Sequence, residues 1–339
     1  MSYTIPTDDR KYDVSGLGNA LVDALVRIED DQLLTTMGLN RGHMHPVDHD
    51  AWEAAAGSLK HLGIELHSGG SCANTIAALG LMGTTSIYCG QVGADSLGEL
   101  YTKKMLDSCG QHALHTTPHS ATGKCLSIIS GVDAERTMLT DLGAAVQMPS
   151  LGAFTDVIAS SRILHLTGYL LLGDPMKSRA LEAMAAAKAA GVPVSLDAAD
   201  PFVVDAVGDA MRDAIHASDI VFLNAEEATA LCGTSPEAAL EQLAEKIDTV
   251  VVKLGSRGSL VSHMGKRYTA GIHRVDAIDT TGAGDAYAAG FLYGLLNGWD
   301  PGDSADLGSR VAAATVSQIG AVVRDRSHLA AAIAASRAQ

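Results

Sequence analysis

From Arg162 onward, short apolar segments alternate with longer segments of helical character, and this alternation constrains the fold more than any other feature of the chain. Strands are predicted at residues 163–166, 192–196, 220–223 and 249–253, and helices at residues 175–190, 204–216, 225–231 and 236–246. Strands that alternate with helices of this length form a parallel sheet covered by helices on both faces. The pattern therefore predicts a doubly wound, mostly parallel α/β fold.

The residues that follow these predicted strands are polar or glycine: Gly168-Tyr169, Asp197, Asn224 and Leu254-Gly255. Ligands of doubly wound sheets bind at the carboxyl ends of the strands. We therefore expect a ligand site at this edge of the sheet.

A second feature is the stretch Asp279-Thr280-Thr281-Gly282-Ala283-Gly284-Asp285, which precedes an almost wholly apolar segment at residues 286–292. Two glycines flank one alanine, so the backbone can turn tightly and approach a ligand closely. The free N–H groups and the positive dipole end of a helix that begins here suit a phosphate. Asp285 is either an ordinary helix cap or, beside a phosphate, a base that takes a proton from an attacking hydroxyl group.

Four other positions allow a structural or a functional interpretation. Asp23 lies in an apolar segment and is either a satisfied structural acid or an acceptor for substrate hydroxyl groups. Asn224 is a good helix cap, and its spacing from Glu227 also places the two on one face, a turn apart. Tyr169 is either a core aromatic residue or a platform on which a base stacks.

Residues 124–130 and 136–140 read as two strands joined by a hairpin turn. Together with residues 26–47, they are expected to form a small sheet outside the main domain. Arg136, at the start of the second strand, is in the simplest interpretation a solvated charge.

Composition narrows the range of partners and compartments. The net charge of −15 opposes binding to nucleic acid or to an anionic membrane. No apolar run approaches the roughly 20 residues of a membrane span, and the polar residues 1–11 do not resemble a signal peptide. The five cysteines include no C-x-x-C pair, which favours reduced thiols in the cytoplasm.

Residues 279–292 resemble the C-terminal signature of the ribokinase-like, PfkB-type family of carbohydrate and nucleoside kinases. The loop Gly69-Gly70-Ser71-Cys72-Ala73-Asn74 is similar to the N-terminal motif of that family, and with Gly18-Asn19-Ala20-Leu21-Val22-Asp23 it looks closest to the adenosine-kinase-like branch. The resemblance covers nearly the whole chain after Lys11. It implies an α/β kinase core at residues 11–23, 48–110 and 140–330, and a β lid at residues 24–47 and 111–139.

The resemblance implies an ATP-dependent phosphotransferase that acts on a hydroxymethyl group of a nucleoside, with adenosine as the first expectation. Asp285 would be the general base, the N–H groups of residues 282–284 would stabilise the transferred phosphoryl group, and Arg136 would meet the same group. A sugar kinase of the ribokinase or fructokinase type is the first alternative. A catalytically silent nucleotide-binding regulator is the second.

The resemblance also assigns the remaining site residues. The catalytic set comprises Asp285, Gly282, Ala283, Gly284 and Arg136. The substrate-binding set comprises Asn19, Asp23, Gly69, Gly70, Asn74 and Tyr169. The ATP-binding set comprises Asn224, Lys253, Gly255, Ser256, Gly258 and Thr281, although residues 253–258 also read as a turn between two strands.

The same resemblance implies two bound ions and one class of small-molecule partner. Magnesium is expected at Asn224 and Glu227, acting through water, and potassium at Asp279 and Thr281, near Gly320. The expected partner is a small nucleoside or sugar, with no nucleic acid and no membrane. The chain is expected to be a cytoplasmic monomer or homodimer.

Overall fold

The computed structural model describes residues 3–7, 9–132 and 135–337. Within these residues the strands form a sheet of eight, a sheet of five and a separate pair. The large sheet has the order β15-β14-β13-β12-β11-β10-β1-β5. Its strands are β1 (Tyr12–Leu17), β5 (Ser86–Cys89), β10 (Ser161–Thr167), β11 (Val194–Asp197), β12 (Ile220–Asn224), β13 (Thr249–Lys253), β14 (Ser259–His263) and β15 (Lys266–Ala270).

The strands from β5 to β13 in this order are parallel, whereas β14 and β15 are antiparallel at one edge. The predicted strands at residues 163–166, 192–196, 220–223 and 249–253 are thus confirmed as parallel neighbours. The turn predicted within residues 253–258 is also confirmed, because η4 (Gly255–Arg257) joins β13 to β14.

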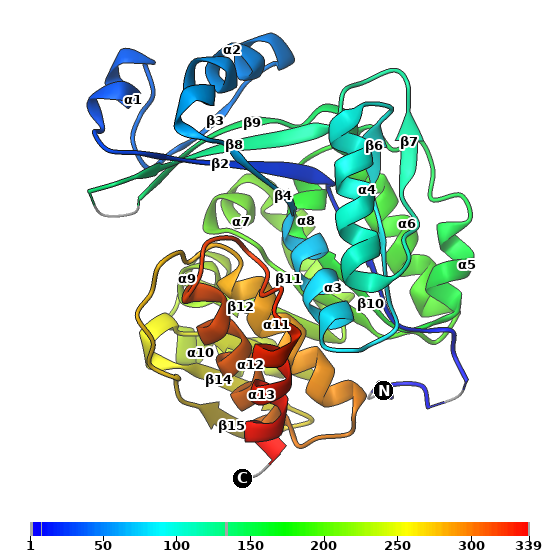
Figure 1. Cartoon of the computed structure of the whole chain (residues 1–339). Helices are drawn as coiled ribbons and strands as arrows, with labels where there is room; N and C mark the ends of the chain where they lie inside the picture. The colour runs from blue at the N-terminus through cyan, green and yellow to red at the C-terminus, as the bar shows by residue number, and fades with distance from the viewer. Residues whose placement is uncertain (1–2, 8, 133–134, 338–339) are drawn as a thin grey trace.

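Helices cover both faces of the large sheet, as the alternation predicted (Figure 1). The helices on one face contribute to a core with β10 to β13: α5 (Phe154–Ala159), α6 (Met176–Ala189), α7 (Pro201–Val207), α8 (Asp209–His216), α9 (Ala225–Cys232) and α10 (Pro236–Ala244). The helices on the other face are α3 (Ser71–Leu81), α4 (Ser96–Cys109), α11 (Ala283–Leu296) and α12 (Pro301–Val316), and α13 (Arg326–Arg337) packs outside them. Two short 3-10 turns are η2 (Gly143–Val146) and η3 (Gly168–Leu172).

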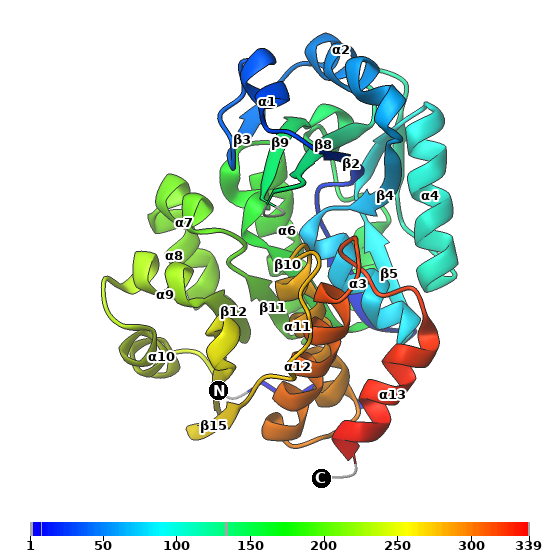
Figure 2. The same cartoon turned by 60° about the vertical axis from the view of Figure 1, so that its left-hand side comes forward.

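The small sheet lies across one end of the large sheet, as Figures 1 and 2 both show. Its order is β3-β9-β8-β2-β4, with β2 (Leu21–Ile28), β3 (Met44–Pro46), β4 (Glu65–Gly69), β8 (Gly123–Ser130) and β9 (Arg136–Asp141). The antiparallel pairing of β8 with β9 confirms the predicted hairpin. The division of the chain into a kinase core and a lid remains a prediction.

Two helices pack against the small sheet: α1 (Gln32–Thr36) and α2 (His49–Leu59), followed by η1 (Lys60–Leu62). Asp48 caps α2 by accepting a bond from the backbone of Ala51 at 2.8 Å. The separate pair consists of β6 (Gln91–Gly93) and β7 (His115–Thr117). No helix within the described residues combines the length and the apolar character needed to cross a membrane.

Small residues set the distance between α11 and α12. A Cβ atom added to Gly290 would lie 2.8 Å from the Cα atom of Gly308, and one added to Gly294 would lie 2.4 Å from the Oγ atom of Ser304. Contacts this short with backbone atoms force the two helices apart. The helix that begins at the Gly282 loop is therefore held in place by close backbone packing.

We predict that Gly290→Ala destabilises the protein by about 1–3 kcal/mol, because its methyl group meets backbone atoms of α12. Gly57→Ala in α2 is the matched control, because nothing lies within 4 Å of an added Cβ atom there. This control should leave stability unchanged or raise it by up to about 1 kcal/mol. Urea unfolding followed by circular dichroism measures both changes, and equal stability of the two variants would contradict the packing.

Candidate active site

The loop before α11 is fixed by Asp279 and by the segment after α12. Gly282 has φ +71°, and a Cβ atom there would lie 2.5 Å from the carbonyl oxygen of Ala321. The Asp279 carboxylate accepts bonds from the N–H groups of Thr281 (2.9 Å) and Gly320 (3.0 Å), and from the Thr281 hydroxyl. Burial raises the pKa of Asp279, but these bonds outweigh it and leave the pKa below its usual range. Asp279 therefore stays ionised and holds the loop.

Asp285 lies in the first turn of α11 and faces α3. The Ser71 hydroxyl donates to its Oδ1 atom at 2.6 Å, and the Asn74 amide donates to its Oδ2 atom at 2.9 Å. Burial raises the pKa of Asp285 to about 6, although these two bonds act in the opposite direction. A carboxylate with this pKa suits a general base near neutral pH.

Asp23 in β2 lies against the backbone of β4. A Cβ atom on Gly69 would fall 2.1 Å from its Oδ2 atom, so only glycine fits opposite this acid. Burial raises the pKa of Asp23 to about 7; Arg136 opposes this shift, and Asp285 adds to it. The structure thus brings Asp23, Asp285 and Arg136 within electrostatic range of one another.

Two buried amide oxygens complete this part of the cluster. The Oδ1 atoms of Asn19 and Asn74 accept no hydrogen bond from any described residue. Gly70 has φ +92°, and a Cβ atom there would lie 2.3 Å from the carbonyl oxygen of Asn19. The predicted substrate residues of both loops therefore adjoin one another, with unused acceptors for hydroxyl groups.

Lys253 brings a positive charge to the start of α11. Its Nζ atom lies 2.7 Å from Oδ2 of Asp197, and 3.1 Å from the position of a Cβ atom on Gly284. Burial alone would lower the pKa of Lys253, but Asp197 and Glu227 raise it overall, so the ammonium group stays charged. The absence of a side chain at Gly284 leaves this ammonium group next to the helix N-terminus.

Asn224 and Glu227 form a capping box at the start of α9. Glu227 accepts from the backbone N–H of Asn224 (2.7 Å) and from its side-chain amide (2.5 Å), through different oxygens. Burial raises the pKa of Glu227 to about 7, against the effect of Lys253. Because both oxygens already accept bonds, the arrangement suits a magnesium ion held through water more than direct ligation. No group of three or more potential metal-ligating residues occurs in the described parts of the chain.

Arg136 reaches the loop from β9 and donates to the hydroxyl of Thr281. It therefore links the small sheet to the start of α11.

Tyr169 lies in η3 and packs, partly buried, against the hydrophobic core formed by β10 to β13 and the helices on that face. Burial raises the pKa of Tyr169. The effect of Asp285 on the same pKa places Tyr169 near the cluster.

Gly255, Ser256 and Gly258 lie on the β13–β14 turn, at the same end of β13 as Lys253. Among the described residues, no hydrogen bond or ion pair joins these three to the residues around Asp285. Gly258 is conformationally required, because a Cβ atom there would lie 2.0 Å from the carbonyl oxygen of Ala270. The structure therefore supports the turn, which follows directly on Lys253, the partner of Asp197.

Ser71 and Asp197 contact the cluster directly. Ser71 was not expected at the site, and Asp197 was expected only as one of the polar residues at the ligand edge. Asp197 followed a predicted strand, so its place at the active edge was available as a signal. Ser71 gave no comparable signal, because its contact with Asp285 joins residues 214 positions apart.

Residues 46–326 match the pfkB family of carbohydrate kinases. Adenosine kinase from Saccharomyces cerevisiae is 28% identical over 275 residues, which are 76% of this chain and 79% of that protein.

Two solved structures resemble this one over 96% of this chain and 99% of theirs. Adenosine kinase from Sinorhizobium meliloti has a TM-score of 0.84 at 33% identity, and a probable sugar kinase from Rhizobium etli CFN 42 has a TM-score of 0.85 at 30% identity. The predicted ribokinase-like fold and the predicted phosphotransferase class are confirmed. Because the family match spans most of its length, the chain belongs to the pfkB family of carbohydrate kinases.

Proposed function

We propose that this kinase transfers the γ-phosphoryl group of ATP to a hydroxymethyl group of a nucleoside, with Asp285 as the general base. The observation that carries the proposal is the position of the Asp285 carboxylate. It lies in the first turn of α11, is partly buried, has a pKa that burial raises, and is in electrostatic range of Asp23. A proton acceptor beside a helix N-terminus is what transfer of a phosphoryl group to an alcohol requires.

ATP, with Mg²⁺ held through water at Asn224 and Glu227, would supply the phosphoryl group. Asp285 would take the proton of the substrate hydroxyl while the hydroxyl oxygen bonds to the γ-phosphorus and the bond to the β-phosphate oxygen breaks. Lys253 and Arg136 would balance negative charge near the transferred group. In a chain of net charge −15, these two cations and the helix N-terminus provide the local positive potential.

The backbone of the Gly282 loop would complete the anion site. In the described chain, the N–H groups of Gly282 and Gly284 donate to no protein acceptor, whereas that of Ala283 donates to the carbonyl oxygen of Thr280 at 3.3 Å. Gly282 and Gly284 are therefore immediately available to a phosphoryl oxygen. Ala283 would first have to release Thr280.

The remaining assignments are part of the same proposal. Asn19, Asp23, Gly69, Gly70 and Asn74 would hold the substrate hydroxyl groups, and the β13–β14 turn with Thr281 would adjoin the nucleotide. A potassium ion at Asp279 and Thr281 is disfavoured, because the Asp279 carboxylate already accepts three bonds and the Arg136 guanidinium contacts Thr281. The proposed mechanism therefore does not depend on potassium.

Two aromatic residues favour a nucleoside as the substrate. Tyr169 follows β10, and Phe202, which is 58% exposed, lies at the start of α7 after β11. Aromatic faces at the active edge offer stacking to a base, which a free sugar lacks. The likeness to adenosine kinases supports the same choice.

A sugar kinase is the second candidate, because the chain is equally similar in fold to a probable sugar kinase. A silent regulator is disfavoured, because Asp285 and the residues that contact it form a complete hydrogen-bonded cluster. We also propose a cytoplasmic location, which fits the five free cysteines. The alternatives of monomer and homodimer stay open.

Asp285→Asn should lower the rate of phosphoryl transfer by about 10²- to 10⁴-fold, because the amide cannot accept the substrate proton. Binding of ATP should persist. Asp303→Asn is the matched control, because Asp303 is an exposed acid in the first turn of α12. Coupled ADP-release assays and nucleotide titration measure both properties, and an Asp285→Asn rate within a few-fold of wild type would refute the mechanism.

The pH dependence of kcat/KM should show an acidic limb near pH 6, because Asp285 must be ionised to act as a base. Ser71→Ala removes a donor that lowers the pKa of Asp285, so the limb should move to higher pH. Asp23 and Glu227 titrate in a similar range, but Ser71 makes no hydrogen bond to either. A limb that stays in place in Ser71→Ala would assign it to another acid.

Adenosine and related nucleosides should be phosphorylated with a higher kcat/KM than ribose or fructose. The reason is the pair of aromatic side chains at the active edge, on which a planar base stacks over a larger area than a free sugar does. Measurement of ATP-dependent product formation by mass spectrometry, with each acceptor in turn, tests this order. A strong response to free hexose, with none to nucleosides, would establish the sugar kinase instead.

A further inference from the structure

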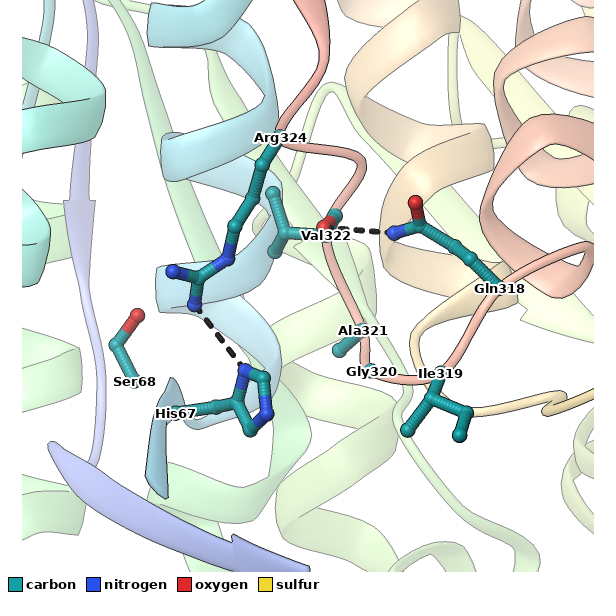
Figure 3. A pocket seen from close by; sticks show the side chains of 8 residues that line it. All are labelled: His67, Ser68, Gln318, Ile319, Gly320, Ala321, Val322 and Arg324. Atoms are coloured by element: carbon teal, nitrogen blue, oxygen red, sulfur yellow. Dashed lines mark hydrogen bonds between the residues drawn. The ribbon is translucent and has the colours of Figure 1, made fainter. Parts of the chain in front are cut away.

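A small cavity lies between β4 and the segment that follows α12 (Figure 3). Its volume is about 120 Å³, and its lining comprises His67, Ser68, residues 318–322 and Arg324. One water molecule accounts for about 30 Å³ of liquid, so the cavity can hold a group of several heavy atoms. None of the side chains used in the proposed phosphoryl transfer lines it.

Several hydrogen-bond donors line this cavity. The Arg324 guanidinium donates to Nδ1 of His67 at 3.2 Å, and Figure 3 shows the Ser68 hydroxyl directed toward the same guanidinium. Arg324 has no carboxylate partner among the described residues. The N–H groups of Ala321 and Val322 likewise donate to no acceptor in that part of the chain.

Two basic side chains, His67 and Lys104, lie within electrostatic range of Arg324. Burial and the charge of Arg324 lower the pKa of both His67 and Lys104 of α4. Two carboxylates lie nearby: Glu65 lies 3.5 Å from Nε2 of His67, and Asp107 pairs with Lys103 at 2.7 Å. The bond from Lys103 lowers the pKa of Asp107, and Arg324 adds to this shift. An anion between Arg324 and Lys104 would relieve their repulsion.

We infer that this cavity binds a phosphate group, held by the Arg324 guanidinium and the N–H groups of Ala321 and Val322. A guanidinium and free backbone N–H groups match the oxygens of a tetrahedral anion. The phosphate is either the free ion or part of a small phosphorylated metabolite.

The cavity adjoins the loop that precedes α11, so a bound group could affect the position of this active-site loop. Gly320 lines the cavity and donates its N–H to Asp279 at 3.0 Å. Ala321 also lines it and packs against Gly282. A phosphate group in the cavity would therefore contact the residues that hold the loop.

Calorimetric titration of the whole protein with inorganic phosphate, at constant ionic strength, tests the inference. Arg324→Gln should weaken one binding component by about tenfold or more, because a charge-assisted hydrogen bond is lost. Phosphate bound at the start of α11 would persist in this variant. Arg212→Gln, which changes an exposed arginine of α8, is the control and should bind as wild type does.

Lys104→Gln is the second test, and it should weaken the same component by a smaller factor. If Arg324→Gln lowers the melting temperature, its loss of phosphate binding could reflect a disturbed fold, and the Lys104→Gln result then tests the phosphate site. A parallel titration with glycerol phosphate shows whether the monoester or the free ion binds more tightly. The binding of the tighter ligand must weaken in Arg324→Gln. Equal phosphate affinity in wild type, Arg324→Gln and Lys104→Gln would overturn the inference.

Discussion

The contact between α11 and α3 through the Asp285 carboxylate is the interaction on which the active site depends. Ser71 and Asn74 each donate to one oxygen of this buried acid. These bonds stabilise the ionised form, while burial destabilises it, and the balance leaves the pKa between that of an exposed acid and neutrality. The acid can therefore be ionised at physiological pH and still accept a proton.

The surrounding architecture keeps several acids together with few cations. Asp197 and Glu227 are buried, and Asp23 and Asp285 are partly buried beside them. Burial raises the pKa values of Asp23, Glu227 and Asp285, and neighbouring acids add to each shift. Lys253 pairs with Asp197, and Arg136 approaches from the small sheet. An acidic cluster of this kind favours ligands that bring their own cation, which is how kinases receive ATP with magnesium.

The fold could be predicted well where local patterns decide it. The strands β10 to β13 lie between helices on both faces of the sheet, so their apolar runs identified them in the sequence. The residue at which α3 begins was harder to predict from local sequence. The position of the loop before it depends on the close packing of Gly69 against Asp23, a residue of another strand. The alanine-rich segment after Leu329 forms part of α13, and Leu329 and Ala332 pack in one apolar cluster with residues of α12.

The candidate site could be predicted in part from the same patterns. Asp285 and the Gly282 loop stood out because glycine spacing and an apolar helix are local signals. The pairing of Ser71 with Asp285, and of Lys253 with Asp197, could not be predicted, because each joins segments that meet only through tertiary packing. The choice between nucleoside and sugar also depends on side-chain placement around Tyr169 and Phe202, which local pattern does not determine.

A crystal structure with adenosine and a non-hydrolysable ATP analogue would show directly whether Asp285 is the general base. We expect the hydroxymethyl oxygen within about 2.6–3.2 Å of an Asp285 carboxylate oxygen, on the side facing the γ-phosphorus. A bound acceptor whose hydroxymethyl group points away from Asp285, with another acid within hydrogen-bonding distance of it, would rule out this role for Asp285.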